Sequence, residues 1–320
     1  MRIAILDPEN QDIGLKIVYP EADYFIINED KDYGYYRKES YGYYNIKVHD
    51  DISKINSINY DILFIVLRVK DTVINTTNFY LHMNKINSIL NQNNFKKVII
   101  FDNDDYDYDP NDYFKNRNVN LFLKRNYSKN KIYKDNVISF PFVIFGLVSI
   151  IEKIDRDLLS ENEYFNMENK NDRLYFSGNL FNHIDEKMGV YRNRRKLHEE
   201  FSSYISTSGF VYYQWYIEYM QRSKFSLDLP GVGDPNIRTF EILLSGSLML
   251  SFYNDLKWPF EEEFSDYTKF KSIEEFKDKY SILQNNIDIY NEALKTQYNI
   301  VKKYFNLNWL RGYINKLIET

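Results

Sequence analysis

Short apolar runs alternate with longer polar or amphipathic stretches along the first half of this chain. Such alternation is typical of strands joined by helices, and it favours parallel sheets over a β-sandwich. Between two of the runs, Thr76 to Leu90 places its apolar residues on one helical face. The pattern therefore predicts a doubly wound α/β domain. Its expected strands are Arg2 to Leu6, Ala22 to Ile27, Ile62 to Leu67 and Lys97 to Phe101, with two short edge strands at Val119 to Leu123 and Val137 to Phe140.

The second half repeats the alternation after a polar interval. Asp155 to Asp172 is charged and lacks a clear period, which suits a connection between domains. We expect a strand at Arg173 to Ser177, a basic helix at Tyr191 to Phe201 and a mostly helical end at Ile273 to Ile318. A chain of 320 residues fits two domains of roughly 100–200 residues each. The prediction is two Rossmann-like α/β domains, residues 1–165 and 166–320.

Composition removes several classes of protein. The absence of cysteine excludes disulfides, thiolate metal sites and a cysteine nucleophile. A net charge of -5 argues against a general nucleic-acid binder. The longest apolar stretch, Val137 to Ile151, contains Pro141 and Gly146 and is shorter than the roughly 20 residues of a membrane span. Because the first apolar run is also too short for a signal peptide, we expect no transmembrane segment and a cytoplasmic location.

The most informative segment runs from Lys224 to Ser251 and reads KFSLDLPGVGDPNIRTFEILLSGSLMLS. Its first residues alternate as a strand, and Pro230 to Gly233 form a flexible turn. Asp234 and Pro235 are a preferred pair for a helix N-cap and first helical position, so a helix is expected to run to about Leu244. Gly246 supplies the left-handed residue that ends a helix, and a strand resumes through Phe252. The unit is strand, glycine loop, helix, strand.

The start of this helix suits a diphosphate. A helix that follows a glycine loop presents unpaired backbone N–H groups and a positive dipole end, which makes Gly231, Gly233 and Asn236 candidate contacts. Arg238 would pair its fork of donors with phosphate oxygens, and Glu241 would accept from two ribose hydroxyls. The alternative is an ordinary surface ion pair between these two residues.

Helical spacing separates two stripes on the same helix. Arg238, Glu241 and Ser245 share a polar stripe that is expected to look into a cleft. Ile237, Phe240 and Leu244 share a stripe that is expected to face the core.

The segment resembles the donor-binding region of GT-B glycosyltransferases, in which a strand, a glycine turn and a helix with Arg-x-x-Glu precede a small-residue strand. It is most similar to the exostosin-like, CAP10-like and CgeB-like groups, through SKFSL before the turn, RTFE in the helix and SGSLML after it. Arg173 to Gly178 with Tyr191 to Leu197 is similar to the first strand and helix of the same donor domain, and Trp309 to Ile314 to its closing helix. The likeness covers roughly Arg173 to Ile318.

The resemblance implies a function and further site residues. It implies two domains with a cleft between them, the first on the acceptor side and the second binding the donor. Ser177 and Gly178 would lie near the donor phosphates, and Arg192, Arg194 or Arg195 would neutralise the departing diphosphate; a solvated helix face is the alternative for each arginine. The implied reaction is transfer of a hexose from a nucleotide-diphosphate sugar to a glycan, lipid-linked or glycoconjugate acceptor, with no cofactor required.

The catalytic base and the stereochemistry stay open at this point. Asp12, in the loop after the first strand, and His49 are candidate bases, because such loops open at the carboxyl edge of a sheet. The acidic loop Asp102 to Pro110 would bind a metal, bind the acceptor or act as a base, or simply be solvated; no metal site is predicted. The basic run from Lys124 to Lys134 either binds an anionic acceptor or is a solvated loop.

One repeated motif and the overall pattern of the chain allow other interpretations. Tyr-Gly-Tyr-Tyr occurs twice between Tyr33 and Tyr44, as a loop offering aromatic faces to an acceptor or as a hairpin covering the sheet. The dinucleotide-like pattern also fits an NAD-dependent oxidoreductase, although Asp7 to Gly14 lacks the Gly-x-Gly-x-x-Gly turn. A non-catalytic protein that binds nucleotides or glycans is the third possibility, since fold alone does not define activity.

Overall fold

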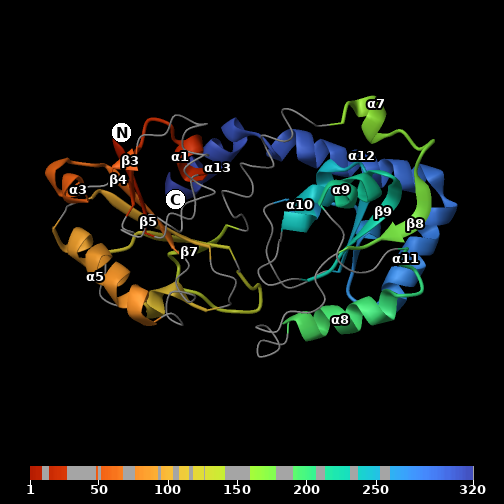
Figure 1. Ribbon diagram of the computed structural model, residues 1–320, viewed down its shortest axis with the longest axis horizontal. Helices are drawn as coiled ribbons and strands as arrows, with labels where there is room; N and C mark the ends of the chain where they lie inside the picture. The colour runs from red at the N-terminus through yellow and green to blue at the C-terminus, as the bar shows by residue number, and fades with distance from the viewer. Residues whose placement is uncertain are drawn as a thin grey trace. The chain divides into compact units, whose positions relative to one another are not determined.

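A computed structural model describes most of the chain in two compact units. Unit 1 comprises Met1–Ser149 and Leu310–Thr320, and unit 2 comprises Ile150–Trp309. Both are α/β structures built on a parallel sheet (Figure 1). The described residues are 1–8, 14–26, 48–49, 52–67, 76–92, 95–103, 108–114, 118–125, 127–140, 159–177, 190–206, 213–230, 237–252 and 260–319.

Unit 1 contains a seven-stranded sheet in the order β3-β2-β1-β4-β5-β6-β7. Every pairing is parallel, and β1 lies between β2 and β4 where the strand order reverses. This is the doubly wound arrangement that the alternating apolar runs predict. The strands are β1 (Ile3–Asp7), β2 (Asp23–Ile26), β3 (Val48–His49), β4 (Ile62–Leu67), β5 (Lys97–Asp102), β6 (Leu121–Lys124) and β7 (Val137–Ser139).

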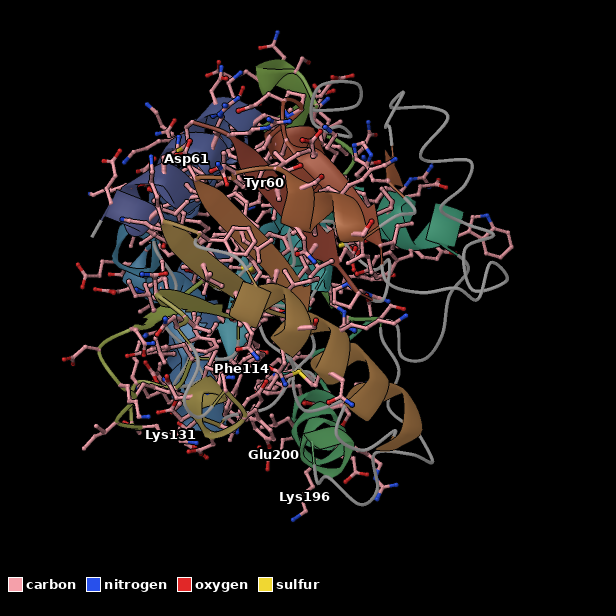
Figure 2. All side chains as sticks on the ribbon, turned by 90° about the vertical axis from the view of Figure 1, so that its left-hand side faces the viewer. Tyr60, Asp61, Phe114, Lys131, Lys196 and Glu200 are labelled. Atoms are coloured by element: carbon pink, nitrogen blue, oxygen red, sulfur yellow. The ribbon has the colours of Figure 1, made fainter. Side chains whose placement is uncertain are left out.

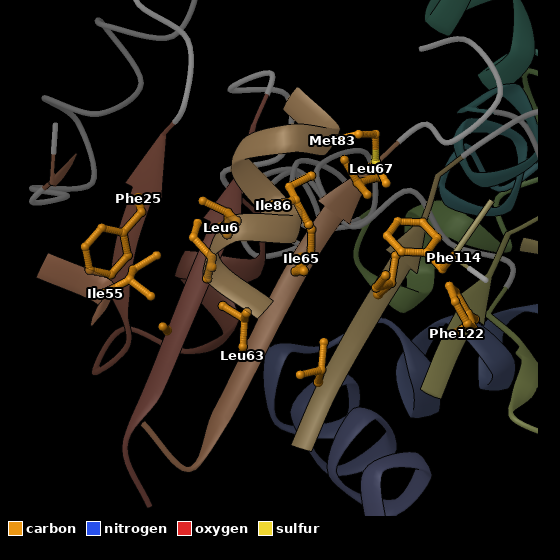
Figure 3. Close-up of a cluster of buried hydrophobic side chains, with 14 of the residues drawn as sticks. Leu6, Phe25, Ile55, Leu63, Ile65, Leu67, Met83, Ile86, Phe114 and Phe122 are labelled. Carbon is orange, nitrogen blue, oxygen red and sulfur yellow. The ribbon is translucent and has the colours of Figure 1, made fainter. Parts of the chain in front are cut away.

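One face of this sheet is covered by α3 (Ser53–Ser57) and α5 (Thr76–Gln92). Alternate residues of the strands, such as Leu6 and Ile65, point to this face and pack with Met83 and Ile86 of α5 (Figure 3). The strands themselves are nearly continuous apolar runs, because both faces of a doubly wound sheet are buried. Burial of the α5 stripe explains why its 3.6-residue period was visible in the sequence.

The other face carries a ladder of aromatic rings and the last helix of the chain. Tyr19, which follows α1 (Gly14–Val18), packs on Phe64, and Phe64 contacts Phe101 with ring centroids 5.2 and 5.5 Å apart. Phe101 in turn contacts Phe140, and Phe140 stacks on Tyr313 of α13 (Leu307–Glu319) at 6.0 Å. These tyrosines and phenylalanines are core residues. Much of the high aromatic content therefore has a structural role here.

Unit 2 contains a four-stranded parallel sheet in the order β11-β10-β9-β8. Its strands are β8 (Asn171–Tyr175), β9 (Ser223–Asp228), β10 (Leu248–Phe252) and β11 (Lys269–Phe270). The helices are α7 (Glu161–Tyr164), α8 (Val190–Phe201), α9 (Tyr213–Gln221), α10 (Ile237–Leu244), α11 (Ile273–Asn285) and α12 (Ile287–Tyr304), and the short 3-10 turns are Pro110–Asp112 in unit 1 and Glu261–Glu263 and Asp266–Thr268 in unit 2. Lys196 and Glu200 lie on the exposed face of α8 (Figure 2).

A buried glutamine joins α12 to the start of β10. Gln297 accepts a hydrogen bond from the Met249 amide at 2.9 Å and donates to the Ser247 carbonyl at 2.8 Å and the Tyr164 hydroxyl at 2.7 Å. The strand β11 pairs only with Ser251 and Phe252, so the amide of Met249 has no strand partner on that side. The side chain of Gln297 takes the place of the missing strand.

Replacing Gln297 with leucine should lower the free energy of unfolding by about 2–4 kcal/mol. The buried Met249 amide and Ser247 carbonyl lose this partner, and the Tyr164 hydroxyl, which still donates to the Leu243 carbonyl, loses a donor. Gln284→Leu is the matched control: Gln284 is exposed and donates one long hydrogen bond of 3.4 Å, so its loss should cost less than about 0.5 kcal/mol. Urea unfolding of both variants measures the difference. Equal stability of the two variants would contradict the role given to Gln297.

Several elements differ from the sequence-based expectation. The interval from Asp155 to Asp172 is not a featureless connection where it is described: α7 begins after Ser160, and β8 starts at Asn171. Ser160 and Glu163 form a capping box, a signal that the S-x-x-E spacing carries. Helix α9 and strands β3 and β11 were not predicted either. The two residues of β3 and of β11 are too few to show a period.

Buried tyrosines give the fold a sensitivity to high pH. Burial raises the pKa of Tyr175, Tyr280 and Tyr313 to about 12, and it also raises the pKa of Tyr19, Tyr164 and Tyr290. The unfolded state releases these protons near pH 10, whereas the folded state holds them to higher pH. Stability from this source is therefore complete below pH 10 and is lost as the pH rises through 12.

We expect the free energy of unfolding to fall steadily between pH 10 and 12. Exposed tyrosines such as Tyr219 ionise near pH 10 in the folded protein, so a second rise in tyrosinate absorbance should accompany unfolding. Tyr313→Phe keeps the ring that stacks on Phe140 and removes one titrating hydroxyl, so its slope against pH should be smaller by up to one proton. A flat stability curve through this range, or complete tyrosine ionisation before unfolding, would contradict the expectation.

Candidate functional site

The carboxyl edge of the unit 2 sheet is built by β9, α10 and β10 in the order expected from the sequence. Helix α10 is described from Ile237, and it ends before Gly246, which has a φ of 72°. A Cβ atom added at Gly246 would lie 3.0 Å from the carbonyl oxygen of Tyr164, so both the backbone angle and the close approach require glycine. The predicted left-handed helix stop is confirmed. Open α/β sheets bind ligands at the carboxyl edge, where β9 ends and α10 begins.

Arg238 lies in the first described turn of α10 with a guanidinium that has unused donors. Its carbon Cζ sits 4.9 Å above the ring centroid of Phe176, the residue that follows β8. Its Nε and Nη1 atoms are buried and have no hydrogen-bond partner within the described part of the chain. Buried donors of a charged group are rarely left without an acceptor, because each carries a desolvation cost. The arrangement favours an anionic ligand that is held by Arg238.

Glu241 lies one turn further along α10 and is hydrogen-bonded to a tyrosine of α9. The hydroxyl of Tyr216, on α9, hydrogen-bonds to Glu241. The pKa of Tyr216 is raised mainly by burial and to a smaller extent by the negative charge of Glu241. Burial raises the pKa of Tyr175 to about 12. The hydrogen bond with Ser177 and the positive charge of Arg238 act in the opposite direction but are smaller effects. Tyr216 therefore stays protonated and donates to the carboxylate, which fixes the orientation of Glu241.

The side of α10 opposite this polar pair is anchored to the sheet. Thr239 donates to Oδ2 of Asp228 at 3.0 Å, and Ser251 lies 3.5 Å from the same oxygen. Asp228 is buried at the end of β9, and Thr239 is buried in the first turn of α10 that is described. This connection fixes the helix relative to the strands, so it also fixes Arg238 and Glu241, which share the helix.

The predicted stripes on α10 need one correction. Ser245 does not share the polar stripe: it is buried at 2% exposure, and its hydroxyl donates to the Ile242 carbonyl at 2.8 Å, where it closes the end of the helix. Ile242 and Leu243 are buried, whereas Leu244 is half-buried. The helix is short and lies against both sheet and α12, so its buried face is wider than one stripe.

The remaining predicted donor-site residues are placed only in part. Ser177 follows β8, is 4% exposed and lies beside Tyr175. Arg192 and Arg194 fall in the first turns of α8, but their side chains are outside the described set; Arg195 is half-buried. The other predicted positions, Asp12, Gly178, Gly231, Gly233 and Asn236, lie outside the described residues, as do both Tyr-Gly-Tyr-Tyr repeats.

His49, a candidate base, is hydrogen-bonded to an aspartate in unit 1. Its Nε2 lies 3.4 Å from Oδ1 of Asp23, and the other oxygen of Asp23 accepts from the Tyr60 hydroxyl at 2.7 Å. Burial acts to raise the pKa of Asp23, but the hydrogen bonds from Tyr60 and His49 outweigh it, and the pKa lies below its usual value. Tyr60 and Asp61 immediately precede β4, at the amino edge of the sheet (Figure 2). His49 therefore points to that edge.

The acidic loop and the basic run meet at a buried ion pair. Asp102 ends β5 and Lys124 ends β6; both side chains are 0% exposed, and Nζ of Lys124 is 3.1 Å from Oδ2 of Asp102. Tyr108 donates to the other carboxylate oxygen at 2.7 Å, and the Lys124 ammonium lies 3.9 Å from the Tyr108 ring centroid. The solvated-loop interpretation is therefore wrong for Asp102 and for Lys124.

Asp109 has a local role in the same loop, because it accepts from the amide of Asn111 and caps the short helix Pro110–Asp112. Residues 104–107 lie outside the described set. Among the residues that the structure describes, no three His, Asp or Glu side chains gather in a way that would hold a metal ion. In the same residues, no helix combines the length and apolar character of a membrane span.

Sequence reasoning missed Tyr175 and Tyr216 as neighbours of the Arg-x-x-Glu pair. Both come from elements that precede the motif in the chain, and neither has a spacing relation to Arg238. The signal that the sequence offers is the aromatic density around Trp215.

Comparison with known proteins agrees with the geometry. Residues 170–309 match the family model described as glycosyl transferase-like. The match lies wholly within unit 2. No curated protein matches the sequence.

Solved structures extend the likeness to the whole chain. T4 phage β-glucosyltransferase bound to UDP-glucose is 13% identical with a TM-score of 0.53, and a second structure of that enzyme is 14% identical with a TM-score of 0.52; each comparison covers 100% of both chains. UDP-GlcNAc 2-epimerase from Neisseria meningitidis is 11% identical over 100% of both chains with a TM-score of 0.46. At such identities the T4 phage enzyme establishes fold alone, and the fold is GT-B, with two Rossmann-like domains and a helical carboxyl end.

Proposed function

We propose that this chain transfers a hexose from a nucleotide-diphosphate sugar to a glycan or glycoconjugate acceptor. In the proposal Arg238 binds the donor diphosphate, Glu241 binds the ribose hydroxyls, and the loop before α10 supplies backbone amides. The observation that carries it is the pair of buried nitrogens on Arg238 without a partner among the described residues, one helical turn from an oriented carboxylate. That combination matches the two ends of a ribose diphosphate.

The chemistry needs positive charge at the diphosphate. Negative charge gathers on the leaving group as the bond to the sugar carbon breaks, and a fixed guanidinium lowers that barrier. In the proposal Arg238 supplies this charge, with Arg192, Arg194 or Arg195 of α8 as further cations and Ser177 and Gly178 beside the phosphates. Transfer is proposed to be independent of metal, so it should proceed in the presence of a chelator. Asp12 remains the proposed candidate for a base; His49 is not proposed, because Asp23 holds it at the amino edge of the unit 1 sheet.

Calorimetric titration with a panel of nucleotides tests the function. The T4 phage enzyme is bound to UDP-glucose in its structure, so uridine diphosphate comes first, followed by the guanosine, cytidine, adenosine and thymidine diphosphates and by NAD. Micromolar binding of one diphosphate would support transfer. A preference for NAD would instead support an oxidoreductase, and failure of every nucleotide to bind would overturn the proposal in favour of a scaffold protein.

A further inference from the structure

Two exposed aromatic side chains lie on one face of α9, beside the helix that carries Arg238 and Glu241. Trp215 is 49% exposed and Tyr219 is 41% exposed. They are four residues apart, so they share a face of the helix. The other large apolar side chains exposed among the described residues are aliphatic: Met1, Ile132, Ile282 and Ile287. The exposed aromatic surface of the described chain is therefore concentrated on α9.

This face borders the candidate donor site. Tyr216, next to Trp215 in the chain, hydrogen-bonds to Glu241, so the first turns of α9 lie against α10, and Figure 1 shows the two helices side by side in unit 2. The Tyr219 ring centroid is 6.2 Å from that of Tyr175, and Tyr175 is close enough to Arg238 and Glu241 for their charges to shift its pKa. The helix with the exposed rings therefore packs beside the helix that carries the charged pair.

We propose that Trp215 and Tyr219 form the subsite for the nucleotide base, an inference that rests on the proposed function. A ribose held by Glu241 carries its base on the same ring, on the side away from the phosphates. A base on that ribose would lie within reach of α9, the helix whose Tyr216 donates to Glu241 and whose Trp215 and Tyr219 are exposed. Every nucleobase has a flat π-face, and stacking on an aromatic side chain is a general mode of holding one.

An aromatic platform predicts a particular pattern of affinity. Stacking contributes to binding of the base and not to binding of the phosphates, so the two parts of the ligand can be separated. Uridine diphosphate contains both parts, and inorganic pyrophosphate contains only the charged one. Loss of an aromatic ring should weaken binding of the nucleotide by about fivefold to a hundredfold and leave binding of pyrophosphate unchanged.

The test compares dissociation constants of the full-length protein for uridine diphosphate and for pyrophosphate. Trp215→Ala and Tyr219→Ala should each weaken the nucleotide alone, while Trp215→Phe should retain most of the affinity because it keeps a ring. Ile282→Ala, which removes an exposed side chain from α11 in the same unit, is the control and should change neither constant. Arg238→Ala should weaken both ligands.

Fluorescence gives a second readout that a structural role would not produce. The chain has three tryptophans, so Trp258→Phe and Trp309→Phe together leave Trp215 as the sole tryptophan. Uridine diphosphate should quench its emission, and pyrophosphate should not. Unchanged nucleotide affinity in both alanine variants, or an equal loss for pyrophosphate, would overturn the base subsite while the Arg238 result still stood. If the wild-type chain binds no nucleoside diphosphate, the proposed function itself fails.

Discussion

Arg238→Ala should reduce transfer by about a hundredfold to a thousandfold, the range found when one fixed donor to a developing negative charge is removed. The donor identified by titration serves as substrate, and release of its nucleoside diphosphate gives the rate. Arg238→Lys should recover little, because a single ammonium cannot reproduce the fork that binds two phosphate oxygens. Glu241→Ala should also abolish activity, since the ribose contact is lost.

The same variants should fold almost normally. Removing Arg238 deletes two buried nitrogens that have no partner in the described part of the chain, which is favourable, and one contact with the Phe176 ring, which is unfavourable. The two effects nearly cancel, so the free energy of unfolding should change by less than about 1 kcal/mol. Arg222→Ala is the matched control: this arginine is 64% exposed and pairs with Glu218 at 2.6 Å, so both rate and stability should be unchanged. A stable Arg238→Ala, Glu241→Ala double variant with full activity would contradict the site.

The second large effect concerns the buried ion pair of unit 1. Asp102→Ala should lower the free energy of unfolding by about 3–5 kcal/mol, because it leaves the Lys124 ammonium buried without its carboxylate. Lys124→Met should cost a similar amount. Replacing both, as Asp102→Ala with Lys124→Met, should cost much less than the sum, since no charge then remains without a counterpart.

An exposed ion pair provides the comparison. Lys303 lies 3.0 Å from Glu263 and is 60% exposed, so Lys303→Met should cost less than about 1 kcal/mol. Urea unfolding of the four variants, read by near-ultraviolet circular dichroism, gives the values and the coupling between Asp102 and Lys124. Additive losses in the double variant would show that the two charges do not stabilise each other.

The two sets of variants also separate the roles of the two sheet edges. Arg238 has buried donors that no described residue accepts from, which suits a ligand, whereas Asp102 and Lys124 satisfy each other and also contact Tyr108. Substitution of Arg238, at the edge of the unit 2 sheet, is expected to remove activity and leave stability intact. Substitution of Asp102 or Lys124, at the edge of the unit 1 sheet, is expected to lower stability and to displace β5 relative to β6, because this ion pair joins the ends of the two strands.

The sequence by itself determined the parallel α/β class and the principal strands. Those strands are long apolar runs, and α5, α10 and the carboxyl-terminal helices show a helical period, so local pattern alone identifies them. The strand, glycine loop, helix, strand unit was equally legible, because Gly246 has a conformation that few other residues adopt. Arg238 and Glu241 were found through their spacing within that unit.

Only the tertiary structure decided which distant residues surround those two. Tyr175 and Tyr216 reach Arg238 and Glu241 through the pairing of β8 with β9 and the packing of α9, and sequence spacing contains no trace of that contact. The same holds for Asp102 and Lys124, whose charges looked solvated until the alignment of β5 and β6 placed them together. It holds for α13, whose residues from Leu310 onward join unit 1 through Tyr313 and Phe140. Local sequence pattern indicates whether a segment forms a helix or a strand. The contact partner of a side chain depends instead on which distant segments pack together in the folded protein.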